Sequence, residues 1–288
     1  MFTLGIIGNG FVGKATSLFK CDKINVLVYD IDVEKCEPKG LNLDTLVKRS
    51  NFICICVPTP MKSTGECDTS IVEKCINDIR KSDSYDDSNI QSHIIVRSTV
   101  PVGFCKSMKV NHMPEFLTEA NWEKDFKSCE TWVIGSGVND EEFQMDIYGM
   151  IMIAKEHNVI DNCSVELVDT DTSEFVKLGR NCFLAAKLSI CNEFYEFCQN
   201  KTIDYSKAMG IIGKDKRIGT KYTNVPGPDG KTGWSGTCFP KDTQSFVHQL
   251  KKSNTSSYMI EAALNRNSKV DRLDQDWKDE KNKGRTYV

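Results

Sequence analysis

A glycine-rich turn between an apolar strand and a helical pattern constrains the fold of this chain more than any other feature. The turn reads Gly8-Asn9-Gly10-Phe11-Val12-Gly13 and directly follows the apolar residues 4–7. In such a turn the first glycine permits a tight bend, the second lets backbone approach a pyrophosphate, and the third lets the helix pack closely on the strand. The sequence therefore predicts a dinucleotide-binding strand–turn–helix unit at the start of the chain.

An acidic residue indicates which dinucleotide this unit binds. Asp30 stands at the end of the second apolar run, about 20 residues after the glycines, which is the usual place of a ribose-binding carboxylate. A carboxylate there accepts a hydrogen bond from the ribose 2′-hydroxyl and repels a 2′-phosphate, so NAD is preferred over NADP. The alternative is a glycine turn of another α/β protein, with a carboxylate in this position by chance.

Strand-sized apolar runs continue through the first half of the chain. They are bounded by Gly, Pro, Asn, Asp or Ser, and helix-sized segments separate several of them. This alternation predicts an α/β fold with a Rossmann-type, doubly wound parallel sheet in an NAD-binding domain over residues 1–168. The expected strands are residues 4–7, 25–29, 52–57, 94–96, 131–134 and 165–168.

From about Thr170 the pattern changes to long helices, which predicts a central helical domain over residues 169–288. Asp171 and Glu174 have cap-like spacing, and the segment from there to Asn200 has no proline and one glycine. It can run as one helix of roughly 30 residues that buries its apolar stripe against a partner, in this chain or another subunit. Residues 269–283 are densely charged with mixed sign, which favours a solvated helix or a frayed tail.

Composition excludes several classes of protein. The net charge is −3, and no basic run with interleaved aromatic residues is present, so no nucleic-acid partner is expected. The apolar runs are too short for a membrane span, and the chain enters a strand at once, which leaves no room for a signal peptide. The 13 cysteines include no CxxC pair and the four histidines lie far apart. A cytoplasmic protein without a metal site is therefore expected.

One cysteine stands in an unusual context, Gly236-Thr237-Cys238-Phe239-Pro240-Lys241-Asp242. Proline suits the first turn of a helix, and the residues from Asp242 to 250 have a helical apolar spacing. Cys238 would then precede a helix N-terminus, where the helix dipole favours the thiolate. The alternative is a small buried hydrophobic residue, which is how most free cysteines behave.

Taken in order, these segments resemble the UDP-glucose dehydrogenase family of nucleotide-sugar 6-dehydrogenases. The resemblance runs from Gly8 to beyond Asp242 and rests on the motifs GNGFVG (8–13), VYD (28–30), VPTP (57–60), STVPVG (98–103), PEFLTE (114–119), KRIG (216–219) and GTCFPKD (236–242), together with Lys177 and Asn181. It implies oxidation of a sugar alcohol to the acid with two NAD, and a homodimer through the central helices.

The resemblance also assigns roles to residues. Cys238 corresponds to the nucleophile, Lys177 and Asn181 to the groups that stabilise an oxyanion, and Asp242 to a proton-transfer carboxylate. Glu115 and Thr99 correspond to residues that place or activate the hydrolytic water. Expected cofactor contacts are Gly8, Gly10, Phe11, Val12, Gly13, Asp30, Pro58, Thr59, Thr99 and Lys241, and expected substrate contacts are Glu115, Phe116, Leu117, Lys177, Asn181, Tyr222, Gly236 and, from the neighbouring subunit, Arg217.

The sequence departs from the family at three places. We expect the family's third, UDP-binding domain to be missing, and two residues differ from the family pattern: Ser235 replaces a glycine, and Met113 replaces an asparagine. Two other interpretations therefore stay open. One is a two-electron hydroxyacid or sugar-acid dehydrogenase that does not use Cys238. The other is a truncated, non-catalytic NAD-binding protein.

Overall fold

The structure is a computed structural model that describes residues 1–85, 93–137 and 140–288. The chain forms two compact units. The first comprises residues 1–59 and 69–177, and the second comprises residues 60–68 and 178–288. The boundary lies inside one long helix, nine residues beyond the division at 168 that the sequence suggests. Residues 60–68 leave the first unit and belong to the second.

A seven-stranded sheet forms the centre of the first unit, in the order β2-β1-β3-β4-β5-β6-β7. All neighbouring strands are parallel except β5 and β6. The strands are β1 (Phe2–Ile7), β2 (Ile24–Tyr29), β3 (Phe52–Ile55), β4 (His93–Val96), β5 (Asn111–His112), β6 (Trp132–Ser136) and β7 (Val165–Asp169). The predicted α/β fold is confirmed, and the sheet that the sequence predicts to be parallel is parallel except at the β5–β6 pair.

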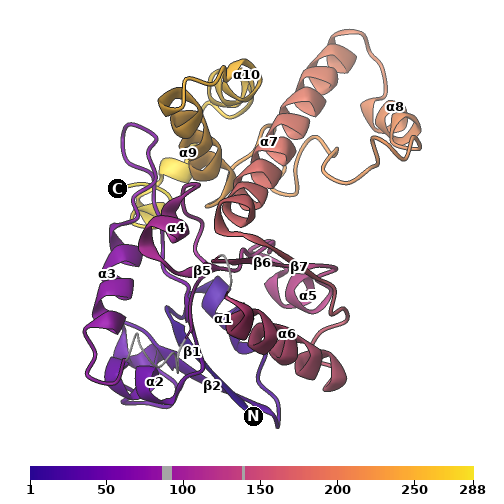
Figure 1. The fold of residues 1–288 in the computed structure, drawn as a ribbon. Coiled ribbons are helices and arrows are strands. Elements are labelled where there is room, and N and C mark those ends of the chain that lie inside the picture. Colours follow the sequence, from indigo (N-terminus) through magenta and orange to yellow (C-terminus); the bar gives the residue numbers. More distant parts are fainter. Residues whose placement is uncertain (86–92, 138–139) are drawn as a thin grey trace. The chain divides into compact units, whose positions relative to one another are not determined.

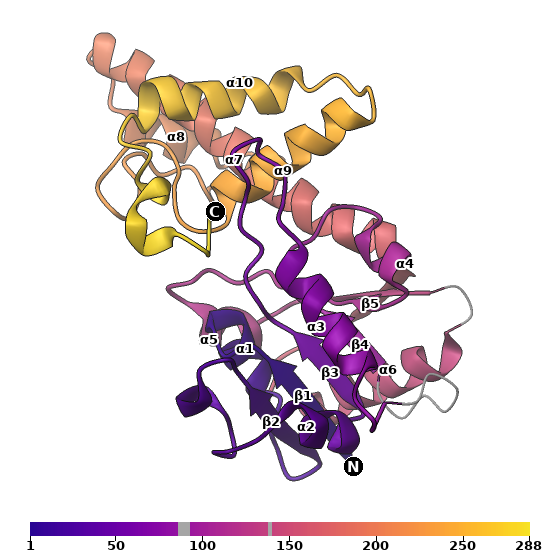
Figure 2. The same cartoon turned by 90° about the vertical axis from the view of Figure 1, so that its left-hand side faces the viewer.

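Helices cover both faces of this sheet (Figures 1 and 2). One face packs against α1 (Phe11–Ser17), α5 (Trp122–Lys127) and α6 (Glu141–Glu156). The other packs against α2 (Leu43–Arg49), α3 (Ser70–Arg80) and α4 (Phe104–Met108). In β4, Ile95 contributes to the first core, whereas Ile94 and Val96 contribute to the second. Burial on both faces explains why the strands read as continuous apolar runs rather than as alternating ones.

The second unit is helical, as predicted. It contains most of α7 (Thr170–Asn200), then α8 (Tyr205–Ile212), α9 (Phe239–Lys252) and α10 (Tyr258–Arg266). Tyr205 and Met209 of α8 pack with Cys191 and Cys198 of α7 in a small core. No helix among the described residues is both long and apolar enough to cross a membrane.

The end of the chain packs into the second unit, so the expectation of a solvated helix or frayed tail is wrong. After a π-helical turn (Asn267–Asp271), Arg272 and Trp277 are 4 % and 3 % exposed. Trp277 stacks on Trp234, and Arg272 donates hydrogen bonds to Asp276. The buried side chains of Trp277 and Arg272 therefore anchor a segment whose density of charged residues predicts exposure to solvent.

Candidate active site

The glycine turn has the backbone geometry that a dinucleotide requires. Gly8 has φ +97°, and a Cβ at Gly13 would lie 1.9 Å from the Gly8 carbonyl oxygen. Neither position accepts a side chain without moving backbone. At Gly10, the N-cap of α1, a Cβ would meet nothing within 4 Å. The space in front of the first turn of α1, which contains Phe11 and Val12, is therefore open. An anion bound by a helix N-terminus occupies such a space.

Asp30 lies against this turn at the end of β2. Its carboxylate accepts hydrogen bonds from the backbone N–H of Asn9 at 2.6 Å and of Asp32 at 2.9 Å. Two donors leave lone pairs on the half-buried carboxylate for a ribose hydroxyl. Together with the open space at Gly10, this arrangement fits NAD.

Further residues expected to contact the cofactor follow β3 and β4. Pro58 and Thr59 come after β3, and Thr59 is 4 % exposed. The Ser98 hydroxyl donates to the Val57 carbonyl at 2.7 Å and joins the two loops, with half-buried Thr99 next in sequence. These loops lie at the carboxyl ends of parallel strands, where open α/β sheets bind ligands. Lys241, the remaining expected contact, belongs to the second unit.

A buried ion pair joins Glu115 and Lys177 in the first unit. The Lys177 ammonium donates to Glu115 Oε1 at 2.6 Å and to the Glu115 backbone carbonyl at 2.7 Å. The Leu117 N–H donates to Glu115 Oε2 at 2.6 Å. Burial opposes ionisation of Glu115, but Lys177, the Leu117 N–H and Arg97 together hold its pKa below the usual value. Glu115 is therefore an ionised carboxylate in a buried site, in a form that can accept a proton.

The structure adds Arg97 to this region, a residue that the sequence reasoning missed. Arg97 directly follows β4, is 2 % exposed, and has no hydrogen-bond partner for Nε and Nη1 within the described residues. The only sequence signal was a charge immediately after a buried apolar run. His112 of β5 is also buried, and burial together with Arg97 and Lys177 lowers its pKa to about 3. His112 is therefore neutral near pH 7.

In the second unit, Asp242 connects α9 to α7. The Asn181 amide donates to Asp242 Oδ2 at 2.6 Å, and the Lys241 ammonium donates to Oδ1 at 2.6 Å. Asp242 is 1 % exposed and Asn181 is 7 % exposed. Burial works against the charge of Lys241, but the Asp242 carboxylate and Cys238 raise its pKa above the usual value. Lys241 therefore stays protonated.

Cys238 is the N-cap of α9, and Pro240 occupies the first turn of the helix, as predicted. The thiol is half-buried, with its Sγ 3.9 Å from the Thr237 hydroxyl. Because α9 begins at this cysteine, the positive end of the helix dipole lies next to the thiol. A half-buried thiol at the N-terminus of a helix is in a position where cysteines can react.

The other expected substrate residues differ in exposure. Phe116 and Leu117 follow Glu115 and are both half-buried. The side chain of Arg217 is 89 % exposed and pairs with Asp215. The Tyr222 ring lies 6.3 Å from that of Phe239, and Gly236 has φ +85°. No group of three or more metal-binding side chains occurs in the described part of the chain.

Together, the sheet with its glycine turn and the helical unit with Cys238 define a two-part, dinucleotide-binding α/β protein. The chain belongs to the UDP-glucose/GDP-mannose dehydrogenase family. The NAD-binding domain of that family matches residues 39–152, and its central domain matches residues 171–269.

Individual relatives extend this match. The chain is 31 % identical over 302 aligned positions to a UDP-glucose 6-dehydrogenase of Rickettsia bellii, covering 91 % of this chain and 65 % of the relative. It is 29 % identical to the UDP-glucose 6-dehydrogenase TuaD of Bacillus subtilis, covering 79 % of this chain and 48 % of the relative. The chain thus spans half to two thirds of the length of these relatives.

Solved structures share the fold. A UDP-glucose dehydrogenase of Pyrobaculum islandicum superposes with a TM-score of 0.78 at 24 % identity, over 93 % of this chain and 68 % of that one. A 3-hydroxyisobutyrate dehydrogenase of Mycobacterium tuberculosis superposes with a TM-score of 0.67 at 14 % identity, over 93 % of both chains. At these identities the likeness concerns the fold alone.

Proposed function

We propose that the protein is an NAD-dependent nucleotide-sugar 6-dehydrogenase that converts a UDP-sugar alcohol to the acid. The observation that carries this proposal is Cys238 at the start of α9, beside a buried Lys241–Asp242 pair that is tied to Asn181. A two-electron alcohol dehydrogenase has no need of such a thiol. A four-electron oxidation does, because the aldehyde must be held between the two oxidations.

The proposed reaction balances around the Cys238 sulfur. Two NAD molecules would be needed, one to accept the hydride of each oxidation, the first leaving as NADH before the second binds. After the alcohol has become an aldehyde, the thiolate adds to its carbonyl carbon and forms a thiohemiacetal. Loss of hydride and a proton from this adduct leaves a thioester. Water then adds to the thioester carbon, the C–S bond breaks, and the sugar acid leaves while the thiol is regenerated.

The buried polar groups support the remaining steps of this proposal. Lys177 and Asn181 lie one turn apart on α7, so they can donate to one oxygen, as an oxyanion requires. Asp242, hydrogen-bonded to Asn181, is the proposed proton-transfer group. Glu115 is the proposed base for the hydrolytic water, since its pKa is held low and it stays ionised. Thr99 is proposed to place that water.

Recognition of the substrate is assigned to exposed and half-buried groups around these residues. Phe116, Leu117, Tyr222 and Gly236 are proposed to contact the sugar nucleotide, and Arg217 is proposed to reach the substrate of a neighbouring subunit. The side chain of Arg217 is 89 % exposed, and its guanidinium pairs with Asp215, two residues away. An exposed arginine on a basic turn can reach a diphosphate outside its own chain.

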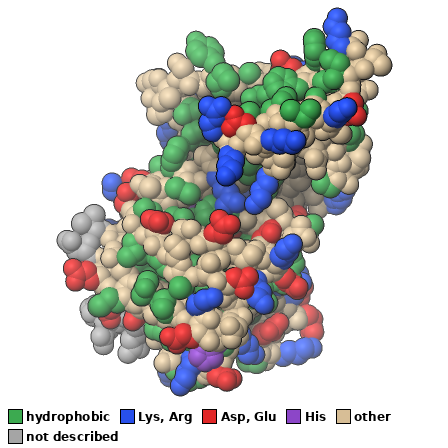
Figure 3. Space-filling model, turned by 90° about the vertical axis from the view of Figure 1, so that its right-hand side faces the viewer, with side chains coloured by type: hydrophobic (Ala, Val, Ile, Leu, Met, Phe, Trp, Pro, Cys, Tyr) green, Lys and Arg blue, Asp and Glu red, His purple; other side chains and the backbone are tan. Residues whose placement is uncertain are grey.

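A homodimer is part of the proposal, and α7 provides its surface. Phe183, Ile190, Phe194 and Phe197 are 71, 48, 46 and 57 % exposed, and their spacing places them on one side of the helix. Exposed hydrophobic side chains are visible on the upper part of the face shown in Figure 3. A second copy of this chain is the occupant that such a stripe fits, because identical helices pair through self-complementary faces.

The test is to count NADH per sugar consumed with NAD and a panel of UDP- and GDP-sugars. Two NADH per UDP-sugar are expected. Cys238→Ser should abolish formation of the acid, whereas Cys163→Ser, at a half-buried cysteine of the first unit, should leave the stoichiometry at two. One NADH per sugar, unchanged in Cys238→Ser, would instead establish a two-electron dehydrogenase on the scaffold shared with 3-hydroxyisobutyrate dehydrogenase. No NADH with any sugar would favour a non-catalytic NAD-binding protein.

A further inference from the structure

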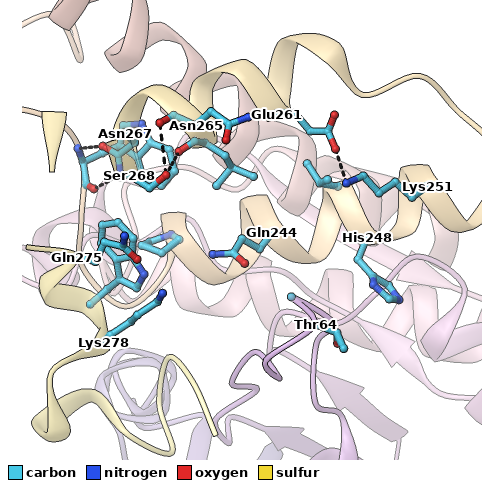
Figure 4. Close-up of a pocket in the computed structure, with 16 residues that line it drawn as sticks. Thr64, Gln244, His248, Lys251, Glu261, Asn265, Asn267, Ser268, Gln275 and Lys278 are labelled. Atoms are coloured by element: carbon cyan, nitrogen blue, oxygen red, sulfur yellow. Dashed lines mark hydrogen bonds and ion pairs between the residues drawn. The ribbon is translucent and has the colours of Figure 1, made fainter. Parts of the chain in front are cut away.

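The second unit contains a pocket that the proposed chemistry does not use. Its volume is about 420 Å³, which is within the range of small-molecule sites. It lies between α9, α10, the loop at Thr64 and the segment that follows the π-helical turn (Figure 4). Gln244 and His248 reach it from one face of α9, while Asp242, two residues before Gln244, bonds Asn181. The pocket therefore belongs to a different side of α9 from that hydrogen bond.

Unused hydrogen-bonding groups converge on this pocket. The side-chain amides of Gln244 and Gln275 bond to no other residue in the described ranges. Figure 4 shows Gln244 projecting into the middle of the pocket and Gln275 lying at one end. Trp277 is 3 % exposed, and its indole Nε1 is buried without an acceptor among the described residues. A buried donor without an acceptor costs about 1–3 kcal/mol, which a ligand acceptor recovers.

The charge in the pocket is positive. Lys251 and Glu261 form an ion pair at one end, which cancels their charges. The Lys278 ammonium makes no ion pair within residues 140–288, and Figure 4 shows it extending toward Gln244. One unpaired cation beside several amides suits a ligand with a single anionic group and several hydroxyls.

Apolar groups supply the rest of the lining. Trp234, Val247, Leu264 and Pro240 line the pocket. Aliphatic groups such as Val247 and Leu264 pack against the C–H face of a sugar ring, while amides bond its hydroxyls. A nucleobase also stacks on indoles, but here both indoles are nearly buried and stack on each other, with centroids 6.4 Å apart. The free groups are amides and an ammonium, which favours a sugar over a base.

We propose that this pocket is a second ligand site, for an anionic monosaccharide such as a sugar phosphate or a uronate. Gln244 and Gln275 bond its hydroxyls, Lys278 binds its anionic group, and Trp277 Nε1 donates to it. The proposal concerns a site apart from Cys238 and does not depend on the dehydrogenase reaction.

Isothermal titration calorimetry on the full chain tests this proposal, with glucose 1-phosphate, glucuronate and neutral glucose as probes. At least one anionic sugar should bind at least tenfold more tightly than glucose. The two anionic probes distinguish a phosphate from a carboxylate as the recognised group. Gln244→Ala and Lys278→Met should each weaken binding about tenfold or more, the loss expected for an unmade bond to a charged or buried group. Cys238→Ser should bind as the wild type does.

Lys281→Met is the matched control, because Lys281 is an exposed lysine three residues along that does not line the pocket. Thermal melting verifies that each variant folds. If Gln244→Ala unfolds, Gln244→Glu serves instead, since it keeps the shape and repels an anion. The proposal is overturned by the absence of heat at about 10 mM ligand, by equal affinity in the pocket variants, or by loss of binding in Cys238→Ser. Tighter binding of UMP that requires Gln244 also overturns it, because the ligand is then a nucleotide.

Discussion

Arg97, Lys177 and Glu115 place two positive charges and one negative charge among the buried residues of the first unit. Lys177 and Glu115 compensate each other at 2.6 Å, but Arg97 has no carboxylate partner among the described residues, and its Nε and Nη1 make no hydrogen bond there. Burying an unpaired charge is costly, and stability alone does not favour it. Its electrostatic effect on Glu115, whose pKa it helps to lower, is the benefit that we assign to it.

We therefore predict that Arg97→Met lowers activity while leaving stability unchanged or higher. The free energy of unfolding should stay the same or rise by up to about 2 kcal/mol, because an uncompensated buried charge is removed. Glu115 should then titrate at higher pH, so that hydrolysis of the thioester slows more at pH 5 than at pH 8. Urea unfolding and the steady-state rate after the first NADH burst measure the two effects.

Arg97→Lys is the control for this prediction, because it keeps the charge. It should retain the acid side of the pH–rate profile of the wild type. A loss of more than about 2 kcal/mol in Arg97→Met would instead mean that the guanidinium is a structural donor, which contradicts the role assigned to it.

Glu115→Gln, unlike Arg97→Met, should lower the free energy of unfolding. Lys177 would keep its buried charge without a counter-charge, and breaking a buried pair in this way costs about 3–5 kcal/mol. Urea unfolding at pH 7 should show this loss, whereas Glu123→Gln at an exposed position should shift the free energy of unfolding by less than about 0.5 kcal/mol. Similar stability of the two variants would show that the Lys177–Glu115 pair does not stabilise the folded chain.

Among the elements, the β1–turn–α1 unit has one glycine that the fold requires and another that only cofactor binding requires. At Gly13 an added Cβ would lie 1.9 Å from the Gly8 carbonyl oxygen, whereas at Gly10 it meets open space. Gly10 also has φ −74°, which alanine adopts without strain. Gly13→Ala should therefore cost at least about 2 kcal/mol of stability, and Gly10→Ala less than about 0.5 kcal/mol.

Both variants should lose affinity for NADH, Gly10→Ala because its methyl group occupies the place of the pyrophosphate. Fluorescence titration with NADH and thermal melting measure the two properties. Full NADH affinity in a well-folded Gly10→Ala variant would exclude this turn as the cofactor site. Gly40→Ala is unsuitable as a control, because Gly40 has φ +78°.

The elements that the sequence predicted correctly are those with a strong local pattern. Six apolar runs bounded by turn residues are strands in the structure. The segment without proline and with one glycine is the 31-residue helix α7. β5 escaped prediction because it has two residues, too few for any periodicity. The packing of residues 272–277 also escaped, since the charges around Trp277 give no local sign that it meets Trp234, more than forty positions earlier.

The candidate site shows the same division. The glycine turn and the first turn of α9 are local patterns, so they could be predicted from spacing. The contact of Lys177 with Glu115 joins residues 62 positions apart, and the sequence supplied both residues through a resemblance without indicating that they pair. Arg97 could not be assigned at all, because its significance lies in a missing partner, which only a folded chain reveals.

At the scale of the whole molecule, the exposed stripe on α7 predicts the oligomeric state. The double variant Phe183→Ser/Phe194→Ser should be a monomer by light scattering where the wild type is a dimer, since a hydrophobic face drives such pairing. Tyr258→Ser, at an 81 % exposed residue of α10, is the control and should stay dimeric. A wild-type chain that is monomeric at micromolar concentration contradicts the proposed homodimer.

The stability of the folded chain should also fall in mild acid because of His112. This histidine is fully buried beside Ser173, and burial, Arg97 and Lys177 lower its pKa from 6.5 to about 3. The unfolded chain therefore takes up a proton below pH 6.5 that the folded chain refuses until about pH 3. Stability from this group is complete above pH 6.5 and is lost as the pH falls toward 3, by about 2 kcal/mol between pH 8 and pH 5.

His112→Asn removes the titration while its amide keeps a polar atom facing the Ser173 hydroxyl. Urea unfolding at pH 8 and pH 5 should show a loss about 2 kcal/mol smaller in this variant than in the wild type, whatever its stability at pH 8. His157→Asn, at an exposed histidine, should keep the loss of the wild type. Equal losses in His112→Asn and the wild type would mean that His112 accepts its proton in the folded chain, in spite of the two cations beside it.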